Sequence, residues 1–393
     1  MRVLMASDVF FPRINGVSTS IETFRRCLAG EGIEVRLVAP SYGDEAPADW
    51  IVRVPGRQVP GDPEDRLVRW RAMHAAVTEA AHDCDLLHVQ TPFVAHYAGL
   101  KAARRLRRPV LATYHTLFEE YLGHYAPFLP AALLRAQARA WSRRQCNALD
   151  ALVVPSRAMQ ERLGEYGVQV PMHVLPTGIP LDRFAAGDRA AFRARHGIAP
   201  ERPVALFVGR VAHEKNIGFL LEAMKIVSRR VPQALLLVTG EGPAMPDLRR
   251  QAKALGLGAR VCFLGYLDRA SELPDCYAAA DVFVFASRTE TQGLVLLEAM
   301  AAGLPVIALA EMGTRDILGP RRGAIVPPDD VDAFGRALCD YFERREVWPA
   351  LADEARRYAA EWSDSALAAR LAGLYRQLVN EHHKENNGKS AQG

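Results

Sequence analysis

DVFVFASRTETQGLVLLEAMAAGLPVIA, residues Asp281 to Ala308, is the stretch that decides the fold. The continuous apolar residues from Val282 to Phe285 predict a buried strand, and the apolar spacing that follows Gly293 predicts a helix. The polar residues between them would form a loop at the carboxyl end of the strand, the edge at which open α/β sheets bind ligands. The first N–H groups of the helix lack partners within it, so the stretch predicts a site for an anion such as a phosphate.

Two glutamates lie on either side of this predicted anion site. Glu290 is in the loop, and Glu298 follows eight positions later inside the helix. If the helix begins near Gly293, Glu298 is about 7 Å along it. A phosphate at the helix start would then have one glutamate on each side, which suits the ribose, diphosphate and sugar of a nucleotide-sugar.

The string ETQGLVLLE from Glu290 to Glu298, followed by AMAAGLP ending at Pro305, resembles the E-x7-E motif of a large enzyme family. This is the family of retaining, metal-independent glycosyltransferases with the GT-B fold, glycosyltransferase family 4 (group 1), and the resemblance extends from Val3 to about Leu378. It implies that Glu290 is catalytic and that the donor is contacted by Thr291, Gln292, Gly293, Leu294, Val295 and Glu298.

Strand-like and helix-like segments alternate twice along the chain. Such alternation predicts an α/β fold of two Rossmann-like, doubly wound domains, and two such domains in series would face one another across a cleft. The strands expected in the first half are Val3–Met5, Val35–Ala39, Ile51–Val54, Leu86–Val89, Val110–Thr113, Leu152–Pro155 and His173–Leu175. Those expected in the second half are Val204–Val208, Ala234–Thr239, Val261–Phe263, Val282–Phe285, Val306–Ala308 and Ala324–Val326.

The polar segment after Pro180, punctuated by proline and glycine, is interpreted as the interdomain connection. We therefore expect an acceptor-side domain at residues 1–180 and a nucleotide-sugar-binding domain at residues 181–365. Residues 366–380 are expected to form a helix that, in the resembled family, crosses back to the first domain. The polar residues 381–393 are expected to be a disordered tail.

Composition limits the classes of function. The chain has 393 residues, enough for two domains, with 49% hydrophobic and 24% charged residues, which is typical of a globular protein. A net charge of only +4 argues against nucleic acid as a partner. No apolar run is long enough to predict a membrane-spanning helix. Six scattered cysteines without a C-x-x-C pair favour buried thiols in a reducing cytoplasm.

Two cations open the second half of the chain. Arg210 follows the predicted strand Val204–Val208 and Gly209, and Lys215 precedes a predicted helix. Fixed cations at this edge suit a pyrophosphate that leaves with additional negative charge, and they can replace a divalent metal. The alternative is a pair of solvated surface charges. Gly-Arg followed by Lys-Asn resembles the family pattern, which implies that Arg210 and Lys215 hold the diphosphate.

Two glycine-containing turns are candidates for donor binding. Gly16 and Val17 precede a helix expected to begin near Ser18, and glycine allows a backbone to approach a phosphate. A plain turn between strand and helix is an equal alternative, but the segment resembles the family loop that contacts the donor diphosphate. Gly242 lies in the string GEGP, which resembles the family turn beside the nucleotide. That string lacks the third glycine of a dinucleotide fingerprint.

His115 follows the predicted strand Val110–Thr113, again at the ligand edge. A single histidine is more often structural, but one beside a cleft can donate a hydrogen bond to a sugar hydroxyl. The family has a histidine at this position near the C6 hydroxyl of the transferred sugar. The resemblance therefore implies that His115 belongs to the catalytic group.

No metal or other cofactor is expected. The D-x-D string Asp83–Asp85 precedes its strand and so would lie at the opposite edge of the sheet. In a second such string, Asp330 and Asp332 are interpreted as residues that cap a helix. No side chain is an obvious nucleophile. The resemblance therefore favours attack by the acceptor on the face from which the diphosphate leaves, with the diphosphate accepting the acceptor proton.

Basic residues are concentrated between Ala98 and Arg144, where nine stand against two acidic residues. A predicted helix places Arg135, Arg139 and Arg143 in one stripe, a pattern typical of helices on anionic membranes, although a solvated helix face has about equal standing. The segments Tyr114–Tyr125 and Ser287–Gly293 resemble the bacterial branch of the family that glycosylates diacylglycerol or other lipids.

We therefore expect a hexosyltransferase that moves glucose or mannose from a UDP- or GDP-hexose to an acceptor hydroxyl of a membrane lipid or a cell-envelope glycan precursor. It would be cytoplasmic, either free or peripheral on the inner face of the cytoplasmic membrane. A soluble acceptor is the first alternative. A catalytically silent binding protein is disfavoured by the intact Glu290, Glu298, Arg210 and Lys215. An oxidoreductase is disfavoured because no G-x-G-x-x-G string is present. One departure from the resembled family lies at Glu311–Asp316, where many members have two glycines before the acidic residue and this chain has Met312 in place of one of them.

Overall fold

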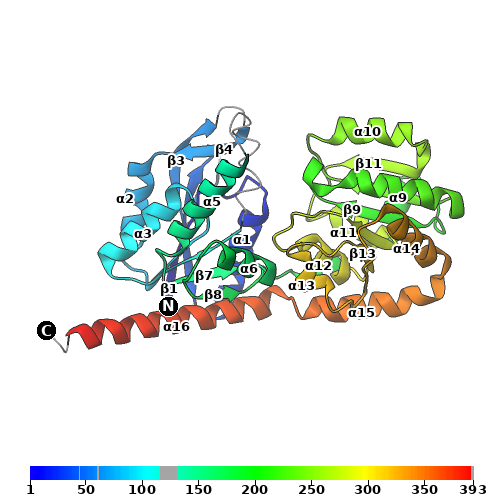
Figure 1. Ribbon diagram of the computed structural model, residues 1–393. Coiled ribbons are helices and arrows are strands. Elements are labelled where there is room, and N and C mark those ends of the chain that lie inside the picture. The colour runs from blue at the N-terminus through cyan, green and yellow to red at the C-terminus, as the bar shows by residue number, and fades with distance from the viewer. Residues whose placement is uncertain (44, 60–61, 116–130, 391–393) are drawn as a thin grey trace. The chain divides into compact units, whose positions relative to one another are not determined.

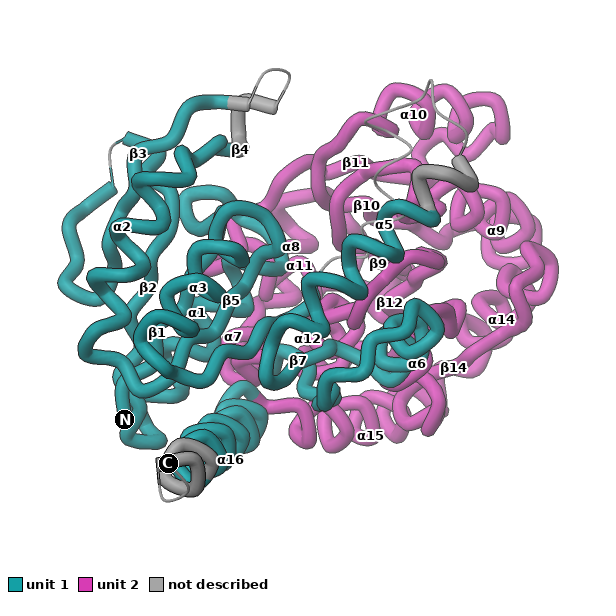
Figure 2. Tube along the Cα trace, turned by 60° about the vertical axis from the view of Figure 1, so that its left-hand side comes forward, with its two compact units in different colours: residues 1–178, 364–393 teal, residues 179–363 magenta. Residues whose placement is uncertain are grey.

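The computed structural model describes residues 1–43, 45–59, 62–115 and 131–390. The chain divides into two compact units, which are distinguished by colour in Figure 2. Unit 1 comprises Met1–Gly178 and Asp364–Gly393, and unit 2 comprises Ile179–Ser363.

Unit 1 is built on a mainly parallel sheet. Its strands are β1 (Arg2–Ala6), β2 (Glu34–Ser41), β3 (Ile51–Val59), β4 (Asp62–Val68), β5 (Leu86–Val89), β6 (Val110–Thr113), β7 (Ala151–Val154) and β8 (Met172–Val174). The described residues give the order β4-β3-β2-β1-β5-β6-β7-β8, in which only β4 is antiparallel to its neighbour. The direction of winding reverses between β1 and β5, so ligands are expected where these strands end.

The helices of unit 1 are α1 (Gly16–Gly30), α2 (Trp70–Ala80), α3 (Val94–Leu106), α5 (Ala131–Cys146), α6 (Arg157–Glu165) and α16 (Asp364–Ser390) (Figure 1). Helices α1 and α16 share one core with alternate residues of the strands: Leu28 and Tyr375 are buried in the same cluster as Val3 and Met5. The far end of the sequence therefore completes the core of the first unit.

Unit 2 has a fully parallel sheet. Its strands are β9 (Val204–Val208), β10 (Leu235–Thr239), β11 (Val261–Gly265), β12 (Val282–Phe285), β13 (Val306–Ala308) and β14 (Ala324–Ile325). Their order is β11-β10-β9-β12-β13-β14, the order of a Rossmann fold. The reversal of winding lies between β9 and β12. The strands that precede Arg210 and Glu290 are therefore neighbours.

The helices of unit 2 are α7 (Leu181–Ala185), α8 (Arg189–Arg195), α9 (Ile217–Arg230), α10 (Met245–Ala254), α11 (Leu273–Ala279), α12 (Leu294–Ala301), α13 (Thr314–Leu318), α14 (Val331–Glu343) and α15 (Trp348–Ala360). Three short 3-10 turns accompany them: η1 (His213–Lys215), η2 (Gly258–Arg260) and η3 (Arg345–Val347). Strands β9, β12 and β13 have the predicted bounds, and each is a fully buried apolar run.

The segment after Pro180 is part of the fold of unit 2, whereas the sequence predicted an interdomain connection there. Phe184 of α7 and Phe192 of α8 are buried, and these helices pack against α11 and α12. Arg193 is also buried: its guanidinium bonds to the Asp281 carboxylate and to the carbonyl of Ala279. Two isolated phenylalanines among polar residues are too weak a pattern to predict such packing.

Two further expectations need correction. Residues 62–68 were not predicted as a strand, because the nearby sequence PGDPED is typical of turns; they form β4 at the edge of the sheet. Residues 381–393 were predicted to be a disordered tail, whereas α16 continues to Ser390. Gln377 bonds to Glu381 one turn later, so the helix has local support there. Within the described residues, no helix combines the length and the apolar character needed to cross a bilayer.

Candidate active site

Lys215 and Glu290 meet where the winding of unit 2 reverses. Strand β9 is followed by Gly209, Arg210 and η1, which ends at Lys215. The Lys215 ammonium forms an ion pair with the Glu290 carboxylate, and both side chains are about one-fifth exposed. Asn216 next to it has a left-handed backbone with φ of 55°, and its side-chain amide donates to the Ala286 carbonyl over 3.2 Å. Two predicted residues are thus joined at the ligand edge.

Arg210 follows the same strand but is more exposed than Lys215 and Glu290. Its side chain is 61% exposed, and Nη1 lies 4.0 Å from Oε1 of Glu214, at the outer limit of an ion pair. A weak surface pair of this kind contributes little to stability. The guanidinium therefore keeps most of its donors for an anion.

Three glycines bring the loops after β9 and β10 into backbone contact. A Cβ atom on Gly240 would lie 2.0 Å from the carbonyl oxygen of Gly209, and one on Gly242 would lie 2.3 Å from that of Val211. Gly240 and Gly242 also have positive φ angles of 118° and 158°. Gly242 is therefore required for loop packing, whatever its contact with a donor.

The loop from Glu290 to Gly293 is held from the side by the segment after β13. The backbone N–H of Gly313 donates to the Glu290 carbonyl over 2.9 Å, and a Cβ on Gly313 would lie 2.0 Å from the Thr291 carbonyl oxygen. Met312 has a φ of 50°, a conformation that glycine adopts more easily. This explains physically why a glycine would suit position 312.

Helix α12 begins directly after Gly293, as the sequence predicted. Gly293 has a φ of 93°, and no side chain caps the helix. Its first N–H groups therefore lack a side-chain acceptor and remain suited to an anion. Leu294 and Val295, at the start of the helix, are partly exposed, as is Thr291, whereas Gln292 is buried.

Glu298 is buried, with 3% of its surface exposed, and both of its carboxylate oxygens have partners. Tyr277 donates its hydroxyl proton to Oε2 over 3.0 Å, and the Arg269 guanidinium donates to Oε1. The sequence analysis missed both partners. Arg269 lies in the loop after β11, and residues that follow parallel strands are candidates for the ligand site, so its position could have pointed to it. Tyr277 lies in the middle of α11, where the sequence pattern gives no indication of a role in the site.

In unit 1, Gly16 and Val17 form the first turn of α1, two residues earlier than predicted. The Asn15 side chain caps the helix by accepting from the Ser18 N–H over 2.8 Å. No heavy atom lies within 4 Å of a Cβ built on Gly16. The protein itself thus leaves space at Gly16.

His115 follows β6 and is hydrogen-bonded to Gln90, with 3.0 Å between Nε2 and Oε1. Burial lowers the pKa of His115 to about 4, so the ring is neutral at pH 7. Nearby, His88 bonds through Nδ1 to the Tyr375 hydroxyl of α16 and through Nε2 to Thr113, over 2.6 and 2.7 Å. The residues after His115, including most of the Tyr114–Tyr125 segment, lie outside the described part of the chain.

The described members of the predicted basic stripe of α5, Arg139 and Arg143, are exposed but also contact their own unit. The Arg139 guanidinium stacks over the Tyr166 ring, with its central carbon 5.2 Å from the ring centre, and the Arg143 side chain lies against Gly167. The side chain of Arg135 lies outside the described residues. Two members of the stripe therefore pack partly on their own unit.

The D-x-D string Asp83–Asp85 lies at the edge of the sheet opposite to the ligand edge, as predicted. Asp85 precedes β5 and accepts a hydrogen bond from the backbone N–H of Arg2, at the start of β1. This is the amino end of the strands, opposite to the ends that carry Gln90 and His115. Among the described residues, no three His, Cys, Asp or Glu side chains are grouped so that they could hold a metal ion.

Comparison with known proteins identifies both halves of the chain. The family description "Glycosyltransferase Family 4" matches residues 14–183, and "Glycosyl transferases group 1" matches residues 188–362. The chain is 34% identical to an alpha-monoglucosyldiacylglycerol synthase of Streptococcus pneumoniae over 318 residues, which are 78% of this chain and 71% of that protein. It is 31% identical to a GDP-mannose-dependent alpha-mannosyltransferase of Mycobacterium tuberculosis, over 96% of this chain and 93% of that protein.

A similar solved structure is that of Anabaena HepE in complex with UDP. Its TM-score is 0.76 at 19% identity, over 96% of this chain and 100% of that chain. This likeness shows the fold, which is GT-B, with two Rossmann-like α/β units. The family match in both halves and the two relatives above 30% identity lead to one conclusion: the chain belongs to glycosyltransferase family 4, and it is a hexosyltransferase.

Proposed function

We propose that this enzyme transfers glucose or mannose from a UDP- or GDP-hexose to a lipid hydroxyl with retention of configuration and without a metal. The observation that carries the proposal is the Lys215–Glu290 pair beside Arg210 and the uncapped start of α12. Two cations and a helix N-terminus at one edge suit a diphosphate that gains negative charge as it leaves. These groups supply the charge that a divalent ion provides in other transferases.

The proposed reaction has a simple balance. The bond between the anomeric carbon and the diphosphate oxygen breaks, and a bond to the acceptor oxygen forms on the same face of the sugar. The acceptor proton passes to the leaving diphosphate. In this proposal Glu290 lies next to the transferred sugar and Lys215 faces the diphosphate. The ion pair between the two side chains keeps them side by side. His115, neutral and oriented by Gln90, would hydrogen-bond a hydroxyl of that sugar.

A lipid acceptor is supported by an exposed surface of α2 and α3 in unit 1. Trp70, Phe93 and Tyr97 are 40%, 51% and 43% exposed, and the cations Lys101 and Arg105 lie on the same helices. The Lys101 ammonium lies 5.9 Å from the centre of the Trp70 ring. Aromatic rings next to cations are typical of surfaces that rest on anionic membranes. Diacylglycerol in the name of the Streptococcus relative is consistent with this proposal.

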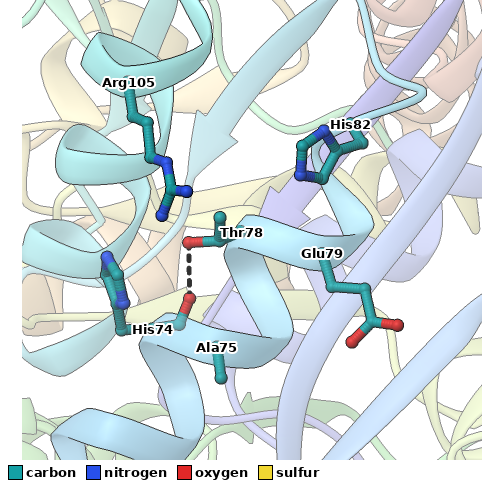
Figure 3. A pocket seen from close by; sticks show the side chains of 6 residues that line it. All are labelled: His74, Ala75, Thr78, Glu79, His82 and Arg105. Carbon is teal, nitrogen blue, oxygen red and sulfur yellow. Dashed lines mark hydrogen bonds between the residues drawn. The ribbon is translucent and has the colours of Figure 1, made fainter.

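A hollow of about 350 Å³ lies on this same surface (Figure 3). Arg105 of α3 and His74 of α2 lie on one side of Thr78, and Glu79 lies on the other side and points away from them. Among the described residues, Arg105 makes no ion pair, and Nε2 of His74 is buried without a hydrogen-bond partner. The hollow therefore adds donors for a phosphate to the cationic surface, which we propose places the enzyme on the inner face of a cytoplasmic membrane.

A donor screen tests the proposal. The purified enzyme is incubated with UDP-glucose, GDP-mannose and related sugars in the presence of a chelator, with diacylglycerol in anionic vesicles or a soluble glycoside as acceptor. We expect one donor to raise the melting temperature and to be consumed with the lipid, giving a product of the donor's anomeric configuration. An absolute requirement for magnesium or manganese, an inverted product, or turnover only with the soluble acceptor would each contradict the corresponding part.

A further inference from the structure

The second glutamate of the motif stands in a buried cluster that the motif itself does not reveal. Glu298 is on α12, Tyr277 is on α11, and Arg269 is in the loop between β11 and α11. A buried carboxylate is stable only when its charge is paired and its oxygens accept hydrogen bonds. Here Arg269 serves one oxygen and Tyr277 the other.

Tyr277 is the most deeply buried member of this cluster. Its side chain is fully buried, and its ring packs edge to face on Phe184 with centres 5.6 Å apart. This packing fixes the position of the phenol oxygen, from which the hydroxyl donates to Glu298. By contrast, a third of the Arg269 side chain is exposed. Its position is set by the ion pair rather than by packing.

A carboxylate has about four acceptor positions, and these two donors use two of them. Among the described residues no third group donates to this carboxylate, so the remaining positions are candidates for ligand hydroxyls, and their directions depend on how the carboxylate is turned. We propose that Tyr277 and Arg269 are positioning residues that hold Glu298 in the orientation in which it accepts hydrogen bonds from the donor ribose. This inference rests on the proposed function together with the expectation from the sequence that Glu298 contacts the ribose of the donor.

The test compares Tyr277→Phe with Tyr341→Phe. Tyr341 is a buried tyrosine of the same unit whose hydroxyl donates to the Asp281 carbonyl over 2.7 Å, at the opposite edge of the sheet. Each variant loses one buried hydroxyl, so both should lower the melting temperature to a similar degree. Only Tyr277→Phe should weaken binding of UDP or GDP, measured by calorimetry, and raise the donor KM, by about 3- to 10-fold with a smaller change in kcat.

A second comparison separates positioning from a general structural role. In the Glu298→Gln background, Tyr277→Phe should cause no further loss of nucleotide affinity, because the group it orients has already changed. Arg269→Leu should weaken nucleotide binding in the same way, with Arg269→Lys intermediate; Arg269 is partly exposed, so these variants should fold. Nucleotide affinity within twofold of wild type for Tyr277→Phe, or full additivity with Glu298→Gln, would overturn the inference. If the wild-type enzyme binds neither UDP nor GDP, the proposed function itself fails.

Discussion

The Lys215 ammonium and the Glu290 carboxylate form an ion pair that joins the loop after β9 to the loop after β12. The two strands are neighbours in the sheet although 75 residues separate the partners in sequence. Because the winding of unit 2 reverses between these strands, the pair stands at the point where such sheets bind their ligands. The ion pair with Glu290 therefore positions the Lys215 ammonium before a substrate diphosphate binds at this edge.

The first prediction concerns the two cations. Lys215→Ala and Arg210→Ala should each lower kcat/KM. The loss should correspond to about 2 to 4 kcal/mol of transition-state stabilisation, which is the effect of removing one electrostatic donor. Lys215→Ala also leaves Glu290 half-buried without its partner and should lower the melting temperature, whereas Arg210→Ala should not. Lys225→Ala, on the exposed face of α9, is the control that should change neither quantity. Wild-type turnover in the Lys215–Arg210 double variant would contradict the assignment.

The second prediction concerns Gly16, where the protein leaves room for a side chain. Gly16→Ala lies in the first turn of α1 and should keep or slightly increase stability, since alanine favours a helix by up to about 1 kcal/mol. If the donor diphosphate approaches this backbone, the new methyl group should still weaken donor binding. Gly242→Ala should behave differently and destabilise the fold, because its methyl group would collide with the Val211 carbonyl. A Gly16→Ala enzyme with unchanged donor KM would remove Gly16 from the site.

Residues near one another in sequence were predicted well, and residues joined only by the fold were not. The run Val282–Phe285 and the start of α12 after Gly293 follow from local apolar pattern and glycine placement. The Tyr277–Glu298 hydrogen bond joins two helices that no local pattern relates. The same is true of the buried Arg193, which bonds to Asp281 across 88 residues.

Where the chain has little apolar content, local pattern also fails. Helices α7 and α8 bury one phenylalanine each, and strand β4 is rich in charge, so neither region shows the period of a helix or a strand over enough residues. The catalytic roles of Glu290, Arg210, Lys215 and His115 remain predictions. The structure shows that Glu290, Arg210 and Lys215 lie at the same edge of the sheet of unit 2. It also shows that the neutral ring of His115 is hydrogen-bonded to Gln90.

The third prediction is acid sensitivity that originates in unit 1. Burial lowers the pKa of His88 to about 3, well below the usual 6.5, so between these values the unfolded chain binds a proton that the folded chain does not. The contribution of His88 is therefore fully present above pH 6.5 and is lost as the pH falls, at up to about 1.4 kcal/mol per pH unit. Urea unfolding between pH 7 and pH 4.5 should show this slope, and His88→Gln should reduce it. An unchanged slope would contradict the buried neutral state.

Asp8 provides a control of opposite sign. Burial raises the pKa of its carboxyl to about 6, although it accepts hydrogen bonds from Thr91 and from the N–H of Ala95. Its contribution to stability is greatest below pH 4 and is lost as the pH rises through 6, which opposes His88. Asp8→Asn should therefore make the loss of stability on acidification steeper. A shallower loss in that variant would mean that the carboxyl is ionised in the folded protein throughout this range.

The last prediction is that the surface of α2 and α3 binds anionic membranes. Each basic residue near such a surface contributes about 1 kcal/mol, and the attraction fades within a Debye length of about 8 to 10 Å. The exposed Lys101, Arg104 and Arg105 are chosen because they lie on the helix next to the exposed ring of Trp70, which Lys101 approaches to 5.9 Å. The enzyme should sediment with vesicles rich in phosphatidylglycerol at low salt and dissociate at high salt.

Two triple variants test which charges are responsible. Reversing Lys101, Arg104 and Arg105 to Glu should abolish binding. Reversing Lys225, Arg229 and Lys253, which are exposed in unit 2, should not, although the net charge changes equally. Equal loss of binding in both triple variants would show that total charge alone is responsible, and full activity on the lipid without any vesicle binding would remove this surface from the function.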